Sequence, residues 1–299
     1  MSTAGPTEET DVFFPHGSRL PYGDGRRQFG VLYPAADPDA PVVVLVHGGF
    51  WRGLYNRWLM LLLVRDLTSS GIACFNVEYR RLGALGGGGG FPETFHDVRD
   101  AVALMADRRR DRAAATRSPL IVVGHSAGAH LALVAAADLA DEVDGVVSIA
   151  GPTDLRRLVG DGSEPVAELL ERAPETCRYA LTSPIERLPL GVPVVCVHGT
   201  HDATVDPRES IDFVTDALAA GDDARLELVP SGTHRAALVP SSDTWRAARR
   251  AVTALVHGRT CAGPTPVDPH GLGRVRSLDV RPECLTGLKN APVRAEGTA

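Results

Sequence analysis

The residues best suited to chemistry stand close together in the segment 124–128, which reads Gly-His-Ser-Ala-Gly and has the pattern G-x-S-x-G. An apolar run at 120–123 precedes this segment, and an Ala/Leu-rich run follows it. The combination is typical of a strand, a sharp turn and a helix, in which the turn exposes the serine hydroxyl. We therefore predict that Ser126 is a nucleophile.

A serine hydroxyl is a weak nucleophile until a base takes its proton, and the base must be oriented by an acid. In folds that carry this motif, the acid and then the base follow the serine, each after a later strand. Asp202 follows the apolar run 194–197, and His234 follows the run 226–229. The sequence thus predicts a catalytic triad of Ser126, Asp202 and His234.

Other residues compete for these two roles. Asp206 lies four residues after Asp202 and is an alternative acid. His201 immediately precedes the acid and His257 ends a predicted helix, so both are weaker candidates for the base. The stretch that begins at His198 contains two histidines and an aspartate, but no further ligand cluster accompanies it. We therefore expect neither a metal nor an organic cofactor.

Two segments offer backbone N–H groups to a developing oxyanion. Ala127 begins the helix after the serine, where an N–H is able to point at negative charge. Residues 47–51, His-Gly-Gly-Phe-Trp, follow another apolar run, and glycine lets such a backbone come close to a carbonyl. We predict that the N–H groups of Gly49, Phe50 and Ala127 form the oxyanion hole and that Trp51 contacts the substrate.

The elements that position these residues follow from hydrophobic patterning. Short apolar runs alternate with helical patterns, which predicts an α/β fold with a mostly parallel central sheet covered by helices on both faces. Strands are expected at 28–33, 42–46, 72–77, 120–123, 145–149, 193–197 and 225–229. Helices are expected at 56–69, 92–115, from the serine turn to about 137, and at 165–173, 208–219 and 242–257.

The domain organisation is read from composition. Residues 1–11 are polar and expected to be flexible, and residues 12–257 form the α/β domain. Within that domain, residues 151–191 are too long for a simple crossover and predict a small cap-like insertion. Residues 258–299 lack periodicity and are expected to be a disordered tail. The glycine-rich residues 83–90 are expected to be a flexible loop near the mouth of the site.

Composition limits the partners. The chain has 299 residues, 44% of them hydrophobic, and a formal net charge of −6, with no basic stripe for nucleic acid. The first ten residues lack the pattern of a signal peptide, and the longest apolar run, 58–64, is too short to span a bilayer. We expect a cytoplasmic protein with a small-molecule substrate, no nucleic acid and no membrane partner; a homodimer remains open.

The five cysteines are widely spaced and include no C-x-x-C pair. Cys74 and Cys196 lie inside apolar runs, where cysteine usually packs as a small apolar residue. This usage predicts a reduced chain without a disulfide framework.

Several segments together resemble a known family. The chain is similar to the α/β-hydrolases over about 12–257 and, more narrowly, to arylformamidase (kynurenine formamidase) and related esterases. The resemblance rests on His-Gly-Gly-Phe-Trp at 47–51, on Gly-His-Ser-Ala-Gly-Ala-His-Leu-Ala at 124–132, and on the segments 151–155 and 183–185. It implies the α/β-hydrolase fold, the same triad and the same oxyanion donors.

The residues and the resemblance together predict a serine hydrolase. Its expected substrate is an N-formyl aryl amide such as N-formylkynurenine, cleaved through an acyl-enzyme, and the resemblance implies a role in tryptophan catabolism. Two alternatives stay open: a general small-acyl carboxylesterase, and a non-catalytic ligand-binding protein on a hydrolase scaffold. A kynurenine-like substrate carries a carboxylate, and Arg52 and Arg80, which follow strand ends, are candidate cations for it.

Overall fold

The computed structural model describes residues 16–111 and 118–258, so the flexible segment expected at 1–11 and nearly all of the tail expected at 258–299 lie outside the described residues. The described strands form one sheet in the order β1-β2-β4-β3-β5-β6-β7-β8. In the sheet order from β4 to β8, all neighbouring strands are parallel. Strand β2 pairs antiparallel with both β1 and β4. The prediction of a mostly parallel sheet is confirmed.

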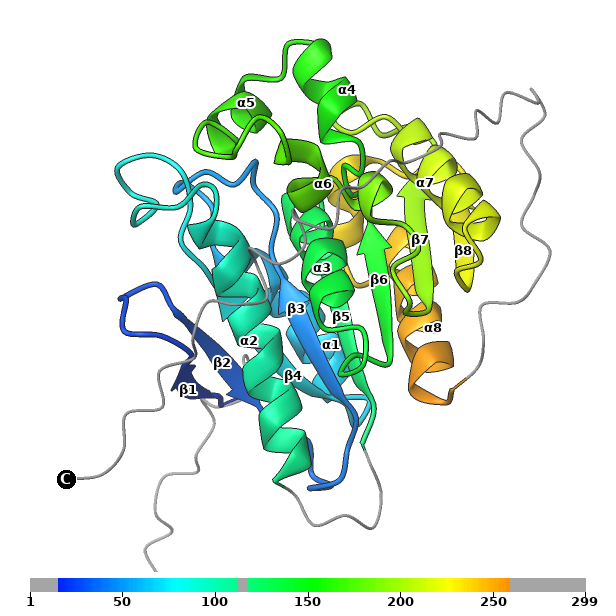
Figure 1. Ribbon diagram of the computed structural model, residues 1–299. Helices are drawn as coiled ribbons and strands as arrows, with labels where there is room; N and C mark the ends of the chain where they lie inside the picture. Colours follow the sequence, from blue (N-terminus) through cyan, green and yellow to red (C-terminus); the bar gives the residue numbers. More distant parts are fainter. Residues whose placement is uncertain (1–15, 112–117, 259–299) are drawn as a thin grey trace, which may run out of the picture.

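The strands and helices alternate along the chain, as the patterning predicts (Figure 1). The strands are β1 (Ser18–Pro21), β2 (Phe29–Tyr33), β3 (Val42–Val46), β4 (Ala73–Glu78), β5 (Leu120–His125), β6 (Gly145–Ile149), β7 (Val194–Gly199) and β8 (Ala224–Val229). The α-helices are α1 (Leu61–Thr68), α2 (Glu93–Arg110), α3 (Ala127–Asp138), α4 (Leu155–Gly160), α5 (Glu164–Leu169), α6 (Arg178–Thr182), α7 (Arg208–Ala219) and α8 (Asp243–Val256). The described residues also form the short 3-10 helices η1 (Arg57–Met60), η2 (Pro184–Arg187) and η3 (His234–Leu238).

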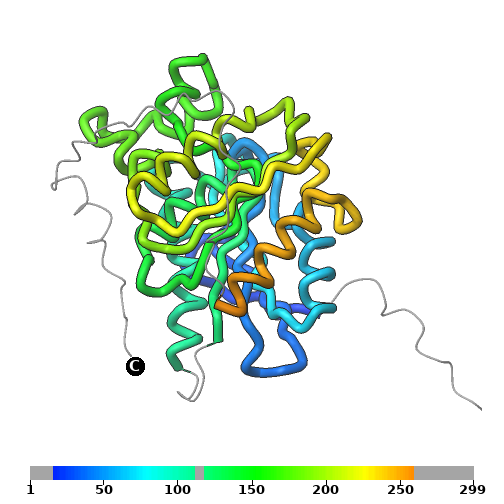
Figure 2. The backbone as a smooth tube through the Cα atoms, turned by 90° about the vertical axis from the view of Figure 1, so that its right-hand side faces the viewer, coloured from blue at the N-terminus to red at the C-terminus, as the bar shows by residue number. Residues whose placement is uncertain are grey.

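The sheet is buried on both faces because successive side chains of a strand point to opposite sides. In β3, Val44 and Val46 pack into one core together with α2, α3 and α7. Val43 and Leu45, between them in the sequence, pack into a second core together with α1 and α8. Figure 2 shows these helices on the two sides of the sheet. Continuous apolar runs are therefore the correct signal for these strands.

The edge strand β1 is absent from the sequence prediction. Its four residues, Ser-Arg-Leu-Pro, are mostly exposed and show no apolar pattern. They pair antiparallel with β2, and the proline is tolerated because it ends an edge strand. Backbone pairing rather than side-chain burial forms this element, so hydrophobic patterning does not reveal it.

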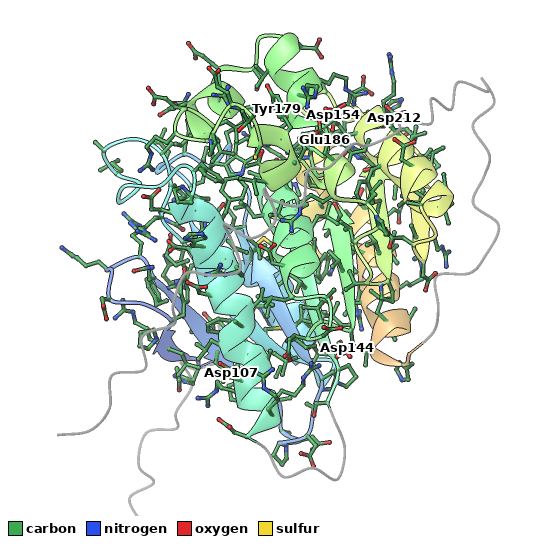
Figure 3. All side chains as sticks on the ribbon, in the orientation of Figure 1. Asp107, Asp144, Asp154, Tyr179, Glu186 and Asp212 are labelled. Carbon is green, nitrogen blue, oxygen red and sulfur yellow. The ribbon has the colours of Figure 1, made fainter. Side chains whose placement is uncertain are left out.

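The chain between β6 and β7 forms a small helical layer beyond the ends of these strands, built from α4, α5, α6 and η2 (Figure 1). Within this layer Arg156 binds Glu186 at 2.7 Å, and an ion pair between Arg157 and Asp212 of α7, at 2.8 Å, ties the layer to the body of the protein. Figure 3 shows Glu186 and Asp212 at this end of the molecule, near Asp154 and Tyr179. We refer to residues 151–191 as the cap.

Two sequence expectations need correction. The glycine-rich segment 83–90, expected to be a loose loop, is bonded back onto Arg81: Gly86 accepts from the Arg81 N–H at 2.8 Å, and Gly89 donates to the Arg81 carbonyl at 2.9 Å. Cys74 and Cys196 are buried as expected, but Cys177 is disulfide-bonded, which a fully reduced chain would not contain. No helix within the described ranges is long and apolar enough to cross a membrane.

Candidate active site

The predicted nucleophile lies on a strained turn between β5 and α3. Ser126 has φ 55° and ψ −125°, an unfavourable conformation for a non-glycine residue, and its N–H donates to the Ile149 carbonyl at 2.9 Å. The motif glycines are required by close packing. A Cβ on Gly124 would lie 2.3 Å from the Gly128 carbonyl oxygen, and one on Gly128 would lie 2.1 Å from the Val46 carbonyl oxygen. A side chain at 124 or 128 would therefore clash with the backbone of this turn or of β3.

The predicted acid and base are in direct contact. His234 Nδ1 lies 2.7 Å from Asp202 Oδ2, while Asp202 Oδ1 accepts the N–H groups of Thr204 and Val205 at 2.8 and 3.0 Å. Asp202 follows β7 and His234 follows β8; because these strands are parallel neighbours, their carboxyl ends lie side by side. The competing acid, Asp206, has a side chain that is 55% exposed and pairs with an arginine instead.

Hydrogen bonds keep the Asp202 carboxylate ionised. Burial by itself raises the pKa of Asp202, but hydrogen bonds from His198, His234 and two backbone N–H groups outweigh it and lower the pKa well below its usual range. His198 Nε2–H donates to the Val205 carbonyl at 3.0 Å and also lies 3.3 Å from Asp202 Oδ2, while His198 Nδ1 accepts from the Ser210 hydroxyl at 2.7 Å. His198 therefore supports the acid as a second donor, a role that the sequence analysis missed.

His125, the residue before the serine, contacts the predicted base, His234. Its Nε2–H donates to the His234 carbonyl at 3.0 Å, and the two rings lie 4.8 Å apart. Burial, together with the charge of His234, lowers the pKa of His125 to about 4, so this ring is neutral. The contacts of His125 and Asp202 hold the His234 ring with Nδ1 protonated and the Nε2 lone pair available as a base.

The hydrogen bonds of the described residues do not include one between the Ser126 hydroxyl and His234; such bonds are often long in enzymes without substrate.

The predicted oxyanion segment is held by a buried histidine. His47 Nδ1–H donates to the Gly48 carbonyl at 2.7 Å. Since C=O and N–H point in opposite directions across a trans peptide, this bond also fixes the direction of the Gly49 N–H. Burial, and then the charge of Arg81, lower the pKa of His47 to about 3. A neutral His47 with its proton on Nδ1 leaves Nε2 to accept from Arg81 at 3.1 Å.

Below this segment, Arg81 lies fully buried and is neutralised by Glu78, with which it forms an ion pair. The Tyr79 hydroxyl donates to the His47 carbonyl at 2.8 Å. The sequence analysis did not identify this cluster. The signal that could have found it is the Glu-Tyr-Arg-Arg stretch at the end of a buried strand, where charged residues require partners.

Trp51 ties the oxyanion segment to the cap. Its side chain is buried, and its ring meets the His130 ring edge-on with centroids 5.3 Å apart. His130 Nε2–H donates to the Thr182 carbonyl of α6 at 2.7 Å, and burial lowers the pKa of His130 to about 4. Trp51 is therefore a structural residue as well as part of the cavity wall.

A cavity of about 200 Å³ opens at Ser126. Four of the predicted site residues line it, whereas Gly49, Asp202 and His234 are not among its lining residues. The cap, the loop after β7 and the first residues of α7 supply the rest of the wall, which the sequence analysis did not predict. The lining residues are Phe50, Trp51, Ser126, Ala127, Pro152, Arg157, Leu158, Asp161, Ser163, Val166, Thr204, Val205, Asp206, Arg208 and Glu209.

The two candidate cations for a substrate carboxylate are both engaged elsewhere. Arg52 pairs with Glu168 at 2.9 Å, and Arg80 pairs with the buried Asp97 at 2.6 Å. Neither arginine lines the cavity. Neither arginine is therefore available as the cation expected to bind a substrate carboxylate.

The weaker histidine candidates lie apart from this arrangement. His201 is exposed, and His257, at the end of α8, bonds to the Thr253 carbonyl at 2.7 Å. In the ranges that the structure describes, no group of three or more His, Cys, Asp or Glu side chains is placed to hold a metal ion.

Known proteins share this architecture. Curated relatives are esterase LipC of Mycobacterium tuberculosis (strain ATCC 25618 / H37Rv), 27% identical over 67% of this chain, and a probable isoprenylcysteine alpha-carbonyl methylesterase ICME of Oryza sativa subsp. japonica, 26% identical over 71%. This chain spans only 55% and 56% of the length of those relatives. A solved truncated carbohydrate esterase from gut microbiota superposes with a TM-score of 0.67 at 19% identity, covering 85% of this chain and all of that one.

The solved structure supports the fold alone at that identity, and the α/β-hydrolase fold is confirmed. The family model named BD-FAE matches residues 31–217, a range that contains Ser126 and Asp202 and ends before His234. Because this match covers more than half of the residues, the chain belongs to the BD-FAE family.

Proposed function

We propose that this chain is a serine carboxylesterase that hydrolyses small-acyl esters. The observation that carries the proposal is the hydrogen bond between Asp202 and His234, because His234 also contacts His125, the residue before a serine that is held on a strained turn at a cavity. The esterases among the relatives support the reaction class. A cavity of about 200 Å³ suits a short acyl group better than a long one.

The proposed reaction uses the same groups in its two half-reactions, acylation and deacylation. The Ser126 Oγ attacks the ester carbonyl while His234 Nε2 takes its proton, and Asp202 stabilises the imidazolium that forms. The N–H groups of Gly49, Phe50 and Ala127 bind the oxyanion. The alcohol leaves with the proton from His234. Water, deprotonated by the same ring, then attacks the acyl carbonyl, the bond to Ser126 Oγ breaks, and His234 returns the proton to Ser126 as the carboxylic acid is released.

The charged residues that line the cavity favour a neutral substrate over one that carries a carboxylate. Two arginines and three carboxylates line it, and each arginine has a carboxylate partner: Arg157 binds Glu209 at 2.6 Å, and Arg208 Nε lies 3.4 Å from Asp206. A substrate carboxylate would meet a lining whose positive charge is already neutralised. The formyl amide of kynurenine carries such a carboxylate, so it is the second candidate, and a neutral ester is the first.

The test compares kcat/KM for p-nitrophenyl acetate and for N-formylkynurenine, with Ser126→Ala as the blank. We expect the ester to be the better substrate and the blank to lose both activities. A preference for the formyl amide by orders of magnitude would replace the esterase with an arylformamidase. Full activity in the blank would contradict the serine mechanism, and a folded protein inactive on every ester and amide would favour ligand binding.

A matched substrate pair tests the charge argument separately. Methyl 3-(4-acetoxyphenyl)propanoate and 3-(4-acetoxyphenyl)propanoate differ in charge at a carboxyl group that two methylene groups separate from the ring, so the leaving phenols have similar reactivity and release of the phenol is measured for both. We expect the neutral ester to have the higher kcat/KM and the difference to narrow as salt screens the cavity. Equal rates at low salt would show that the cavity does not select on charge.

A further inference from the structure

The segment that carries the predicted oxyanion donors is strained. Phe50 and Trp51 both have φ 55°, and the preceding Gly49 has φ 113°. A non-glycine residue in this left-handed region costs about 1–2 kcal/mol. Such a conformation persists only where surrounding contacts hold it. The contacts that hold residues 49–53 therefore decide where the oxyanion N–H groups lie.

Leu82 provides two of these contacts. Its N–H donates to the Trp51 carbonyl at 2.7 Å, and its carbonyl accepts from the Gly53 N–H at 3.0 Å. The two segments thus form a short parallel β-bridge between Arg52 and Leu82. A shift of Leu82 would be transmitted to the backbone of Trp51 and Gly53.

The position of Leu82 depends in turn on Gly86 and Gly89, which bond to the backbone of the preceding residue, Arg81. Gly86 accepts from the Arg81 N–H and Gly89 donates to the Arg81 carbonyl, so the chain turns back directly against this residue. A Cβ on Gly86 would lie 1.9 Å from the Arg81 carbonyl oxygen, and one on Gly89 would lie 2.4 Å from the Arg81 nitrogen. These neighbours are backbone atoms, which cannot rotate away as a side chain would.

The glycine-rich segment also meets the oxyanion segment directly. A Cβ on Gly53 would lie 2.4 Å from the Gly86 nitrogen and 2.6 Å from the Leu85 carbonyl carbon. Two backbones therefore touch at Gly53 and Gly86 with no room for a side chain on either.

We propose that Gly86 and Gly89 are positioning residues for the oxyanion hole, acting through Arg81 and Leu82 on residues 49–53. The proposal rests on the esterase function proposed above. It accounts for a glycine-rich segment that follows no phosphate-binding pattern and lines no part of the cavity at Ser126.

The experiment compares Gly86→Ala with Gly88→Ala. Gly86 has an ordinary φ, so alanine there brings a clash without backbone strain. Gly88 has φ 82° and nothing within 4 Å of its Cβ position, so alanine there brings strain without a clash. We expect Gly86→Ala to lower kcat for p-nitrophenyl acetate about 10- to 100-fold with little change in KM, because misplaced oxyanion donors weaken transition-state binding. We expect Gly88→Ala to keep the kcat of the wild type.

The melting temperature of each variant separates positioning from loss of fold. If Gly86→Ala does not fold, Gly53→Ala reaches the same contact from the other side and is expected to lower kcat similarly. A folded Gly86→Ala or Gly53→Ala with the kcat of the wild type would overturn the proposal. Equal losses of kcat in Gly88→Ala would also overturn it, because backbone strain alone would then explain the effect.

A second readout does not depend on esterase activity. Amide hydrogen exchange in the peptide 49–55, measured by mass spectrometry, reports the Gly53 N–H that bonds to Leu82. We expect faster exchange in Gly86→Ala than in Gly88→Ala or the wild type. If the wild type is inactive on esters, the proposed esterase function is wrong, but the positioning role can still be tested by hydrogen exchange. Unchanged exchange in Gly86→Ala would then overturn the positioning role.

Discussion

His234 Nδ1 lies 2.7 Å from Asp202 Oδ2, although 32 residues separate the two in the sequence. Each follows a strand, and the two strands are parallel neighbours, so the pair forms where both strands end. His198 and two backbone N–H groups complete the environment of the carboxylate. The proposed base, His234, therefore has a fixed orientation and tautomer before any substrate binds.

The acid is tested by Asp202→Asn beside Asp206→Asn. Asparagine at 202 can donate to His234 Nδ1 and so stabilise the wrong tautomer, which lowers kcat about 10⁴-fold in triads of this kind. Asp206 is largely exposed and does not contact His234, so its asparagine variant should change kcat little. Steady-state kinetics with p-nitrophenyl acetate distinguish the two, and a reversed order would assign the acid to Asp206.

Acid sensitivity is expected from the buried histidines. The pKa values of His47, His125 and His130 are lowered to about 3, 4 and 4, whereas an unfolded histidine has a pKa of about 6.5. Below that pH the unfolded chain takes up protons that the folded chain does not. The free energy of unfolding should therefore fall as pH drops from about 6.5 towards 4, by about 1.4 kcal/mol per pH unit for each histidine.

His130→Gln isolates one of these contributions, because the glutamine amide can still donate to the Thr182 carbonyl. Melting temperatures measured from pH 7.5 to 4.5 should fall less steeply in the variant than in the wild type. Parallel curves would show that His130 does not contribute to the acid sensitivity.

The tight turn around the nucleophile is tested by Gly128→Ala beside Gly160→Ala. A Cβ at 128 would meet the Val46 and His47 carbonyl oxygens at 2.1 and 2.4 Å, whereas one at 160 has nothing within 4 Å. We expect Gly128→Ala to cost about 3 kcal/mol of unfolding free energy and Gly160→Ala to be neutral or slightly stabilising. Urea denaturation measures both; equal midpoints would mean that the turn relaxes around the methyl group.

The direction of the Gly49 N–H is tested at His47. Asparagine there has an amide N–H near the place of Nδ1 and can still donate to the Gly48 carbonyl, whereas leucine cannot. We expect His47→Leu to lower kcat more than His47→Asn, with similar KM values. Both variants lose the acceptor for Arg81, so this common loss does not distinguish them. Equal kcat values would indicate that the Gly48 bond does not orient the oxyanion donor.

The sequence by itself determined the central sheet and the turn at Ser126. Continuous apolar runs mark strands that are buried on both faces, and the glycines at 124 and 128 mark a turn that has no room for side chains. Such patterns depend on residues that are close together in the sequence. For the same reason the apolar run of β6 (Gly145–Ile149) and the helical pattern of α7 (Arg208–Ala219) gave the bounds that the structure has. Asp202 and His234 could be predicted as acid and base because chain order and strand ends define the places of these residues.

Only the tertiary structure decided what surrounds those residues. Several contacts join segments whose side chains carry no periodic signal. These are the contact of His125 with His234, the contact of Gly86 with Arg81, and the contribution of cap residues to the cavity wall. Edge strand β1 forms by backbone pairing, which no side-chain pattern marks. The physical reason is that apolar patterning encodes burial one element at a time, whereas pairing of charges and close approach of backbones depend on how the elements pack together.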